Sequence, residues 1–225
     1  MHPLDNPVWA SLQTEHASLA AGTGTVLRYP SDVAPFVATA ERDAEAGTRA
    51  EALVDAGESV CFVGVAPALS KAWRVDQSVS ILQMTSATPL DVAAGPAMAT
   101  LGADDLADML ELTALVYPHY FRPRTPSMGR YIGIRDRGRL IAMAGERMRF
   151  PGHQEISAVC THPDHVGRGH AARLVARLTN DILADGRLAF LHVSKDNLRA
   201  VRLYEHLGYA RRADIPLLAV TRMRT

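Results

Sequence analysis

Apolar residues recur with clear periods in the second half of the chain, and these periods predict its helices and strands. The segment 168–184 repeats an apolar residue every three to four positions, which predicts an amphipathic helix that ends at Gly186. The segment 188–193, "LAFLHV", is almost continuously apolar and predicts a strand buried on both faces. A second helix is predicted over 196–208, because Asp196 or Asn197 suits its N-cap and Gly208 its end.

The neighbouring segments also show patterns of apolar residues that are typical of helices and strands. Strands are predicted over 97–102, 130–136, 139–148, 155–161 and 215–223, and a helix over 103–117 that Pro118 stops. The order strand, helix, three strands, helix, strand, helix, strand predicts a mixed α/β sheet.

Patterning is weaker in the first 86 residues. We expect strands over 25–30, 58–66 and 77–84 and a helix over 40–57. The stretch "ATPLDVAAGP" (87–96) has two prolines and a glycine and is typical of a linker. We therefore predict an N-terminal α/β extension over 1–86 and a main domain over 87–225.

Composition narrows the class of protein. Hydrophobic residues make up 48% of the chain, which indicates a globular fold. Lys+Arg and Asp+Glu both number 24, so no charge excess favours nucleic acid or a membrane surface as a partner. No apolar run approaches the roughly 18 residues of a membrane span. The N-terminal segment lacks the pattern of a secretory signal, so we expect a soluble, cytoplasmic protein.

Two glycines, Gly167 and Gly169, stand at the start of the helix predicted over 168–184. Backbone N–H groups at a helix N-terminus bind anions, and glycines let a ligand approach the backbone closely. Residues 167–172 also satisfy the dinucleotide pattern G-x-G-x-x-A, but five residues separate the first glycine from the preceding strand, and too few follow for a Rossmann domain. A tight turn without a ligand is the remaining alternative.

Two longer segments carry a family resemblance. "EISAVCTHPDHVGRGHAARLV" (155–175) and "LHVSKDNLRAVRLYEHLGY" (191–209) together resemble a bacterial branch of the GNAT superfamily of acyl-CoA-dependent N-acetyltransferases. The resemblance spans about 97–225. It implies a mixed, mostly antiparallel sheet flanked by helices, with acetyl-CoA as the acyl donor and no metal. The sequence departs from the family at Val166, where Arg or Gln is usual, and Arg168 could supply a cation instead.

The resemblance also implies which residues hold coenzyme A. The pyrophosphate would lie on the turn formed by Val166, Gly167, Arg168, Gly169, His170 and Ala171. A bulge would open the edge of strand 155–161, so that main-chain groups of Val159 and Thr161 pair with the pantetheine arm. Asn197 matches a residue that contacts this arm, and it is equally suited to be a plain N-cap.

Two residues are candidates for catalysis. Tyr204 lies where the family commonly places the acid that protonates the departing thiolate, and a core aromatic on the apolar face of its helix is the alternative. Glu155 stands at the head of a strand, where histone-type members of the family place a general base that acts directly or through water. The alternative is that Glu155 is a solvated carboxylate at the end of a strand. Glu146 on the neighbouring strand is a second candidate base.

The predicted activity is transfer of acetyl from acetyl-CoA to a primary amine, directly within a ternary complex. A non-catalytic acyl-CoA sensor is the alternative. Cys61 and Cys160 lie in apolar runs, so we expect buried thiols and no acyl-enzyme. The cluster His162, His165 and His170 has no zinc spacing. The acceptor is a small-molecule or peptide amine, and the protein a monomer or homodimer.

The acceptor site has two candidate contributors. The segment 116–125, "VYPHYFRPRT", places Tyr117, His119, Tyr120 and Phe121 close together, either to line the acceptor site as in the family or to pack under a lid. The first 86 residues could be a degenerate half-copy of the acetyltransferase domain, which extends the sheet or covers the acceptor cleft.

Overall fold

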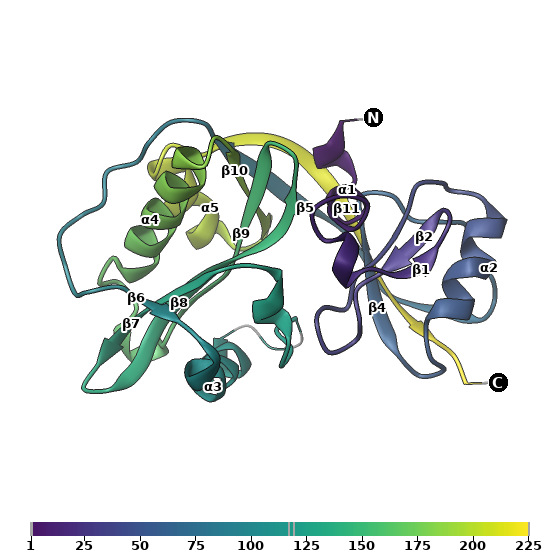
Figure 1. Cartoon of the computed structure of the whole chain (residues 1–225), viewed down its shortest axis with the longest axis horizontal. Coiled ribbons are helices and arrows are strands. Elements are labelled where there is room, and N and C mark those ends of the chain that lie inside the picture. The colour runs from purple at the N-terminus through teal and green to yellow at the C-terminus, as the bar shows by residue number, and fades with distance from the viewer. Residues whose placement is uncertain (1, 117, 119, 225) are drawn as a thin grey trace.

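An eight-stranded sheet forms the centre of the computed structural model, which describes residues 2–116, 118 and 120–224 (Figure 1). Its strands are β4 (Ser59–Val63), β5 (Trp73–Ser86), β6 (Ala99–Leu101), β7 (Tyr131–Asp136), β8 (Arg139–Phe150), β9 (His153–Thr161), β10 (Leu188–Ser194) and β11 (Ala210–Arg222). Their order is β4-β11-β5-β10-β9-β8-β7-β6. Every neighbouring pair is antiparallel except β9 and β10. The predicted mixed, mostly antiparallel sheet is confirmed.

Helices flank this sheet. They are α1 (Pro7–Leu12), α2 (Ala44–Leu53), α3 (Leu106–Val116), α4 (His170–Ala184) and α5 (Leu198–His206). Short 3-10 turns are η1 (Pro3–Asp5), η2 (Ala17–Leu19), η3 (Ala103–Asp105), η4 (Thr125–Met128) and η5 (Pro163–His165). A small sheet of β1 (Ala21–Thr23), β2 (Val26–Arg28) and β3 (Val37–Thr39) lies beside β4, joined by a bridge between Phe36 and Cys61. No helix in the described ranges is long and apolar enough to cross a membrane.

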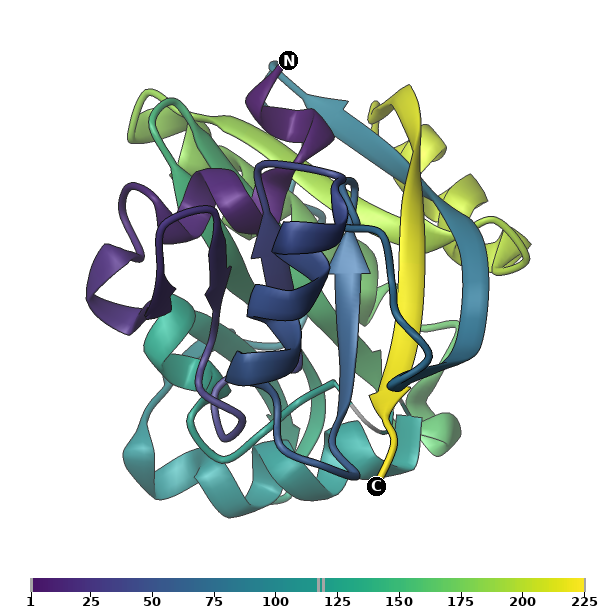
Figure 2. The same cartoon turned by 90° about the vertical axis from the view of Figure 1, so that its right-hand side faces the viewer.

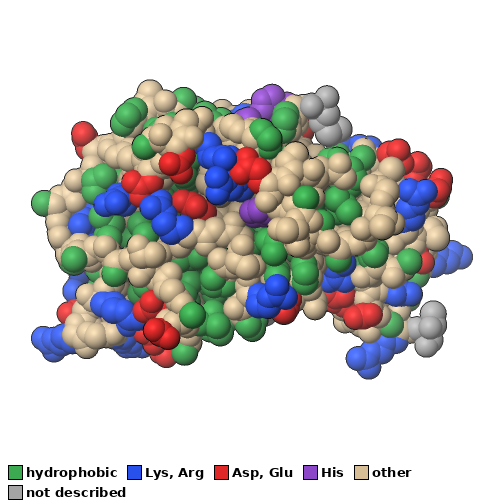
Figure 3. Space-filling view, in the orientation of Figure 1, with side chains coloured by type: hydrophobic (Ala, Val, Ile, Leu, Met, Phe, Trp, Pro, Cys, Tyr) green, Lys and Arg blue, Asp and Glu red, His purple; other side chains and the backbone are tan. Residues whose placement is uncertain are grey.

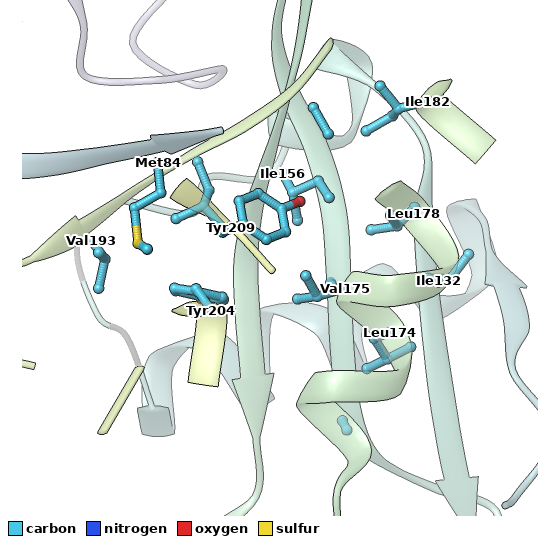
Figure 4. Close-up of a cluster of buried hydrophobic side chains, with 14 of the residues drawn as sticks. Met84, Ile132, Ile156, Leu174, Val175, Leu178, Ile182, Val193, Tyr204 and Tyr209 are labelled. Carbon is cyan, nitrogen blue, oxygen red and sulfur yellow. The ribbon is translucent and has the colours of Figure 1, made fainter. Parts of the chain in front are cut away.

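The two faces of the sheet carry different cores. The apolar stripe of α4 and the inner side of α5 pack on β8, β9, β10 and β5, as the close-up in Figure 4 shows. Leu174, Val175 and Leu178 are fully buried there, which confirms the predicted stripe, and each such side chain contributes about 1.5–3 kcal/mol by its burial. Side chains of the opposite face pack against α1 and the segment around β2 and β3.

The first 86 residues contribute directly to the large sheet. β5 lies between β10 and β11, and β4 lies on the other side of β11 (Figure 2). The N-terminal segment therefore extends the sheet across the predicted boundary at residue 86. Its description as a separate extension or a half-copy stays a prediction.

Local differences from the predicted elements have simple causes. β5 begins at Trp73 instead of residue 77, because its first half pairs with β11 although most of its side chains are exposed. α1 has six residues and β1 and β3 have three each, too few for a periodic pattern to show. On the face seen in Figure 3, positive and negative side chains are intermixed, in keeping with the balanced composition.

Candidate active site

The site begins where β9 and β10 separate. The two strands pair in parallel only over three residues, from Leu188↔His153 to Phe190↔Glu155. Beyond this point β9 continues to Thr161 and β10 to Ser194, and in the described residues neither pairs with the other again. The strands therefore form a fork with main-chain groups facing the gap.

A bulge in β9 widens this fork. Ala158 has φ 50°, a left-handed conformation that is uncommon for a residue with a side chain. The register with β8 shifts at the same place, because Met143 pairs with Cys160 while Gly145 pairs with Ser157. Two residues of β9, Ala158 and Val159, thus oppose one residue of β8. The bulge expected from the resemblance is present, and it lies beside Val159.

A cavity of about 290 Å³ occupies the fork. Its lining comprises Phe36, Val63, Gln77, Val79, Ile81, Tyr120, Arg147, Ile156, Ser157, Ala158, Val159, His192, Val193, Ser194, Asn197, Ala200, Tyr204 and Leu217. Ile156, Val193 and Tyr204 belong to the core beneath α4 and α5, whereas Phe36 and Leu217 belong to the core of the opposite face. The cavity thus draws its walls from both faces of the sheet.

The glycine turn lies at the N-terminus of α4. Gly167 and Gly169 have φ 81° and 76°, which explains why glycines stand there. A Cβ built on either residue meets no described atom within 4 Å, so both glycines border open space. Gly169 is the N-cap of α4 and provides no side-chain acceptor for the N–H groups of the first turn. These donors and their positive dipole end suit an anion.

Polar atoms around this turn also fit a phosphate-bearing ligand. Thr161 Oγ1 and His170 Nδ1 are buried, and neither has a hydrogen-bond partner among the described atoms. Burial lowers the pKa of His170, and so do the nearby charges of His165, Arg173 and Arg168. Cationic side chains therefore surround the turn despite Val166, whose apolar side chain is 45% exposed. Arg168 itself contacts the carbonyl oxygen of Asp164 at 3.2 Å.

Asn197 and Tyr204, at the N-cap and within α5, line the cavity. Asn197 is the N-cap of α5, and its Oδ1 accepts a hydrogen bond from the backbone N–H of Ala200 at 3.1 Å. Its predicted capping role is confirmed, and its contact with a pantetheine arm stays a prediction. Tyr204 is 7% exposed and packs near Tyr209, Met84 and Val193 (Figure 4), yet it also lines the cavity. Both interpretations of Tyr204 are compatible with this position.

Glu155 lies at the base of the fork and is completely buried. Arg147 donates to both carboxylate oxygens at 2.7 Å from Nε and Nη2. The Oε2 atom also accepts the N–H of Met148, and Oε1 lies 2.8 Å from His192 Nδ1. Burial alone would raise the pKa of Glu155, but Arg147 and His192 together lower it to about 2. The carboxylate is therefore charged at neutral pH, and each of its oxygens has two polar neighbours.

The network continues from His192 to solvent. Arg212 donates to Gln83 Oε1 at 2.8 Å and to Asp5 at 2.6 Å. The amide nitrogen of Gln83 then faces His192 Nε2 at 2.9 Å, so this nitrogen accepts and Nδ1 carries the proton that Glu155 receives as a hydrogen bond. These contacts fix the orientation of the His192 ring, with Nδ1 directed at Glu155 and Nε2 at Gln83.

The remaining candidates lie elsewhere. Glu146 pairs with Arg130 at 3.2 Å and does not line the cavity. Across the described ranges, no group of three or more His, Cys, Asp or Glu residues could hold a metal. Cys61 and Cys160 are free and buried as expected, and burial raises the pKa of Cys160 to about 12.

Of the predicted aromatic group, Tyr120 lines the cavity, whereas Phe121 packs edge-on against Tyr131 with ring centroids 5.5 Å apart. Tyr117 and His119 lie outside the described residues. The chemistry-bearing residues missed by sequence reasoning are Arg147 and His192. A histidine inside the apolar run 188–193 was the one signal that could have indicated the latter.

Comparisons with known proteins agree with this geometry. A family model described as FR47-like protein matches residues 131–215. The chain is similar to a crystal structure of a protein assigned to the GNAT family from Novosphingobium aromaticivorans, with 33% identity, 100% coverage of each chain and a TM-score of 0.91. A GCN5-related N-acetyltransferase from Kribbella flavida has the same fold, with 20% identity, coverage of 96% of this chain and 94% of that one, and a TM-score of 0.64. No curated protein sequence matches the chain.

Proposed function

Because the chain belongs to the GNAT superfamily of acetyltransferases, we propose that it transfers an acetyl group from acetyl-CoA to a primary amine. The proposal rests on three features that follow one another around the end of β9. An anion-suited turn opens α4, a bulged strand edge runs past Val159, and the cavity that contains Tyr204 follows directly at the fork.

Coenzyme A is held, in this proposal, on the side of α4 and α5. Backbone N–H groups of residues 167–171 bind the pyrophosphate, and Arg168 and His170 supply nearby positive or polar groups. Main-chain groups of Val159 and Thr161 pair with the amides of the pantetheine arm, much as an added strand pairs with a sheet edge. Asn197 contacts the same arm from the start of α5.

The reaction forms a C–N bond and breaks the C–S bond of the thioester within one ternary complex. The amine enters from the face opposite α4 and α5 and attacks the carbonyl carbon at the fork. Tyr204 then gives its phenolic proton to the departing sulfur. Cys160 takes no part, because its thiol is buried and protonated at neutral pH.

The nitrogen must also lose a proton. Glu155 was the predicted base, and it is enclosed by Arg147, Met148 and His192. We therefore assign it an indirect part, in which its charge holds the His192 ring and the Arg147 guanidinium that border the cavity while water removes the proton from the amine. Replacement of Glu155 by glutamine tests this assignment. Loss of a direct base would abolish turnover, whereas loss of a positioning carboxylate would leave a reduced but measurable kcat.

Thermal unfolding with acetyl-CoA tests the proposal. Acetyl-CoA at one hundred times its Kd should stabilise the protein by about 2.7 kcal/mol, which raises Tm by about 5–10 °C. Gly169→Val should lose this shift, because a branched side chain blocks approach to the backbone. Gly186→Val is the matched control, since Gly186 has φ 73° and an equally open surrounding at the other end of α4.

Two outcomes would overturn the proposal. One is an undiminished shift in a folded Gly169→Val protein, and the other is a preference for NAD over acetyl-CoA. Acetylation of an amine panel then separates an enzyme from a sensor, because a sensor would show the thermal shift and no turnover.

A further inference from the structure

The side of the cavity away from α4 and α5 is an apolar wall. It consists of Phe36, Val63, Val79, Ile81 and Leu217, and all but the last come from the first 86 residues. Phe36, Val63 and Leu217 are buried, whereas Val79 is 41% exposed and stands where the cavity meets solvent. An occupant that reaches the fork from this side therefore contacts mostly hydrocarbon, although the Arg147 guanidinium lies 4.9 Å from the centroid of the Phe36 ring and Gln77 also lines the cavity.

The charged residues around the cavity also disfavour a polycationic acceptor. Among the described residues that line it there is no Asp or Glu, and the charged side chain present is Arg147. The Glu155 carboxylate is not part of the lining and contacts the lining residues Arg147 and His192. An acceptor with a second ammonium group would leave water without gaining an anionic partner, which is costly in a confined site. Polyamines and other polycationic amines therefore fit this wall poorly.

We propose that the acceptor is a primary amine carried on an uncharged apolar body, such as an aryl-alkyl or branched alkyl group, which packs on the wall formed by the N-terminal segment. This inference rests on the proposed acetyl transfer and adds the substrate class. The cavity of about 290 Å³ also has to hold the thioester beside Asn197 and Tyr204, so the part along the wall suits only a compact body. The first 86 residues thus have a role in selecting the acceptor.

An amine panel tests the inference directly. With saturating acetyl-CoA, kcat/KM is measured for 2-phenylethylamine, 3-methylbutylamine, ethanolamine and 1,4-diaminobutane. Each added methylene should raise kcat/KM by about fourfold through apolar burial. 2-Phenylethylamine should exceed ethanolamine by about 30-fold or more, and the diamine should be acetylated least.

Two variants on β5 test whether the apolar wall determines the preference among acceptor amines. Val79→Asp adds a carboxylate at the mouth of the cavity, so we expect kcat/KM to fall about tenfold for 2-phenylethylamine and to rise for 1,4-diaminobutane. Val75→Asp is the matched control, because Val75 lies on the same strand, is 53% exposed and does not line the cavity. It should leave both values unchanged.

The outcomes separate this inference from the proposed function. If acetyl-CoA stabilises the protein while 1,4-diaminobutane or ethanolamine is preferred, the apolar acceptor is refuted and the acetyltransferase stands. The apolar acceptor is equally refuted if no apolar amine is acetylated, or if Val75→Asp and Val79→Asp change the preference to the same extent. If acetyl-CoA does not bind at all, the proposed function itself fails.

Discussion

Replacing Glu155 by glutamine should lower the free energy of unfolding by about 3 kcal/mol at pH 7. The pKa of this carboxyl is lowered from 4.5 to about 2 in the folded protein. Each pH unit of such a shift corresponds to about 1.4 kcal/mol, which gives this magnitude. Breaking a buried ion pair by removing one partner typically costs about 3–5 kcal/mol, and Arg147 would lose its partner here.

The pH dependence of this loss has a defined sign. A carboxyl with a lowered folded pKa contributes its full stability above its unfolded pKa, and the contribution disappears as the pH falls through the folded value. The difference in unfolding free energy between the parent protein and Glu155→Gln should therefore be constant above about pH 5. It should shrink to about half near pH 3 and vanish only below about pH 2.

Urea unfolding between pH 7 and pH 3 measures this difference. The control is Glu45→Gln, which breaks the exposed pair of Glu45 with Arg49 and should cost less than about 0.5 kcal/mol. If Glu155→Gln costs no more than this control at pH 7, the buried pair does not stabilise the fold as argued. Activity of the folded variant adds the catalytic result: a base would lose turnover at every pH, whereas a positioning residue would leave a reduced but measurable kcat.

Two further predictions concern single side chains. Tyr204→Phe keeps the ring in its core position and removes the phenolic proton, so the affinity for acetyl-CoA should be unchanged while kcat falls by about a hundredfold. The fall in kcat should be smaller for thioesters with a more acidic leaving thiol. If kcat is unchanged although the chemical step limits it, Tyr204 is a core residue only. Cys160, whose pKa burial raises to about 12, should resist alkylation by iodoacetamide in the native protein at pH 8, and rapid labelling without unfolding would contradict its burial.

Periodicity was sufficient for the elements after residue 97, because their apolar stripes are long and regular. α4 shows this best, since its buried side chains follow the helical period through four turns. The position of β5 was beyond sequence reasoning. Its first half is mostly exposed, and its place between β10 and β11 is set by pairing with residues more than 100 positions away. Local pattern carries no information about such a distant partner.

The glycine turn at the start of α4 could be recognised from motif residues, whereas the polar cluster at the base of the fork could not. Gly167 and Gly169 are informative in sequence because their positive φ values restrict the residue type. Arg147, Glu155 and His192 come from three strands, and only the sheet brings them together. Glu155 was therefore expected to be a general base or a solvated strand-end carboxylate, and neither interpretation anticipated its complete burial.

The insertion of β11 between β4 and β5 has a consequence for folding during synthesis. β4 and β5 leave the ribosome early, but neither pairs directly with the other, and β11 supplies the ladder between them. Until residue 222 has emerged, both strands keep open edges that can pair with other chains. The N-terminal segment is thus exposed to aggregation for most of translation, and a nascent chain that stops before β11 should require chaperone protection.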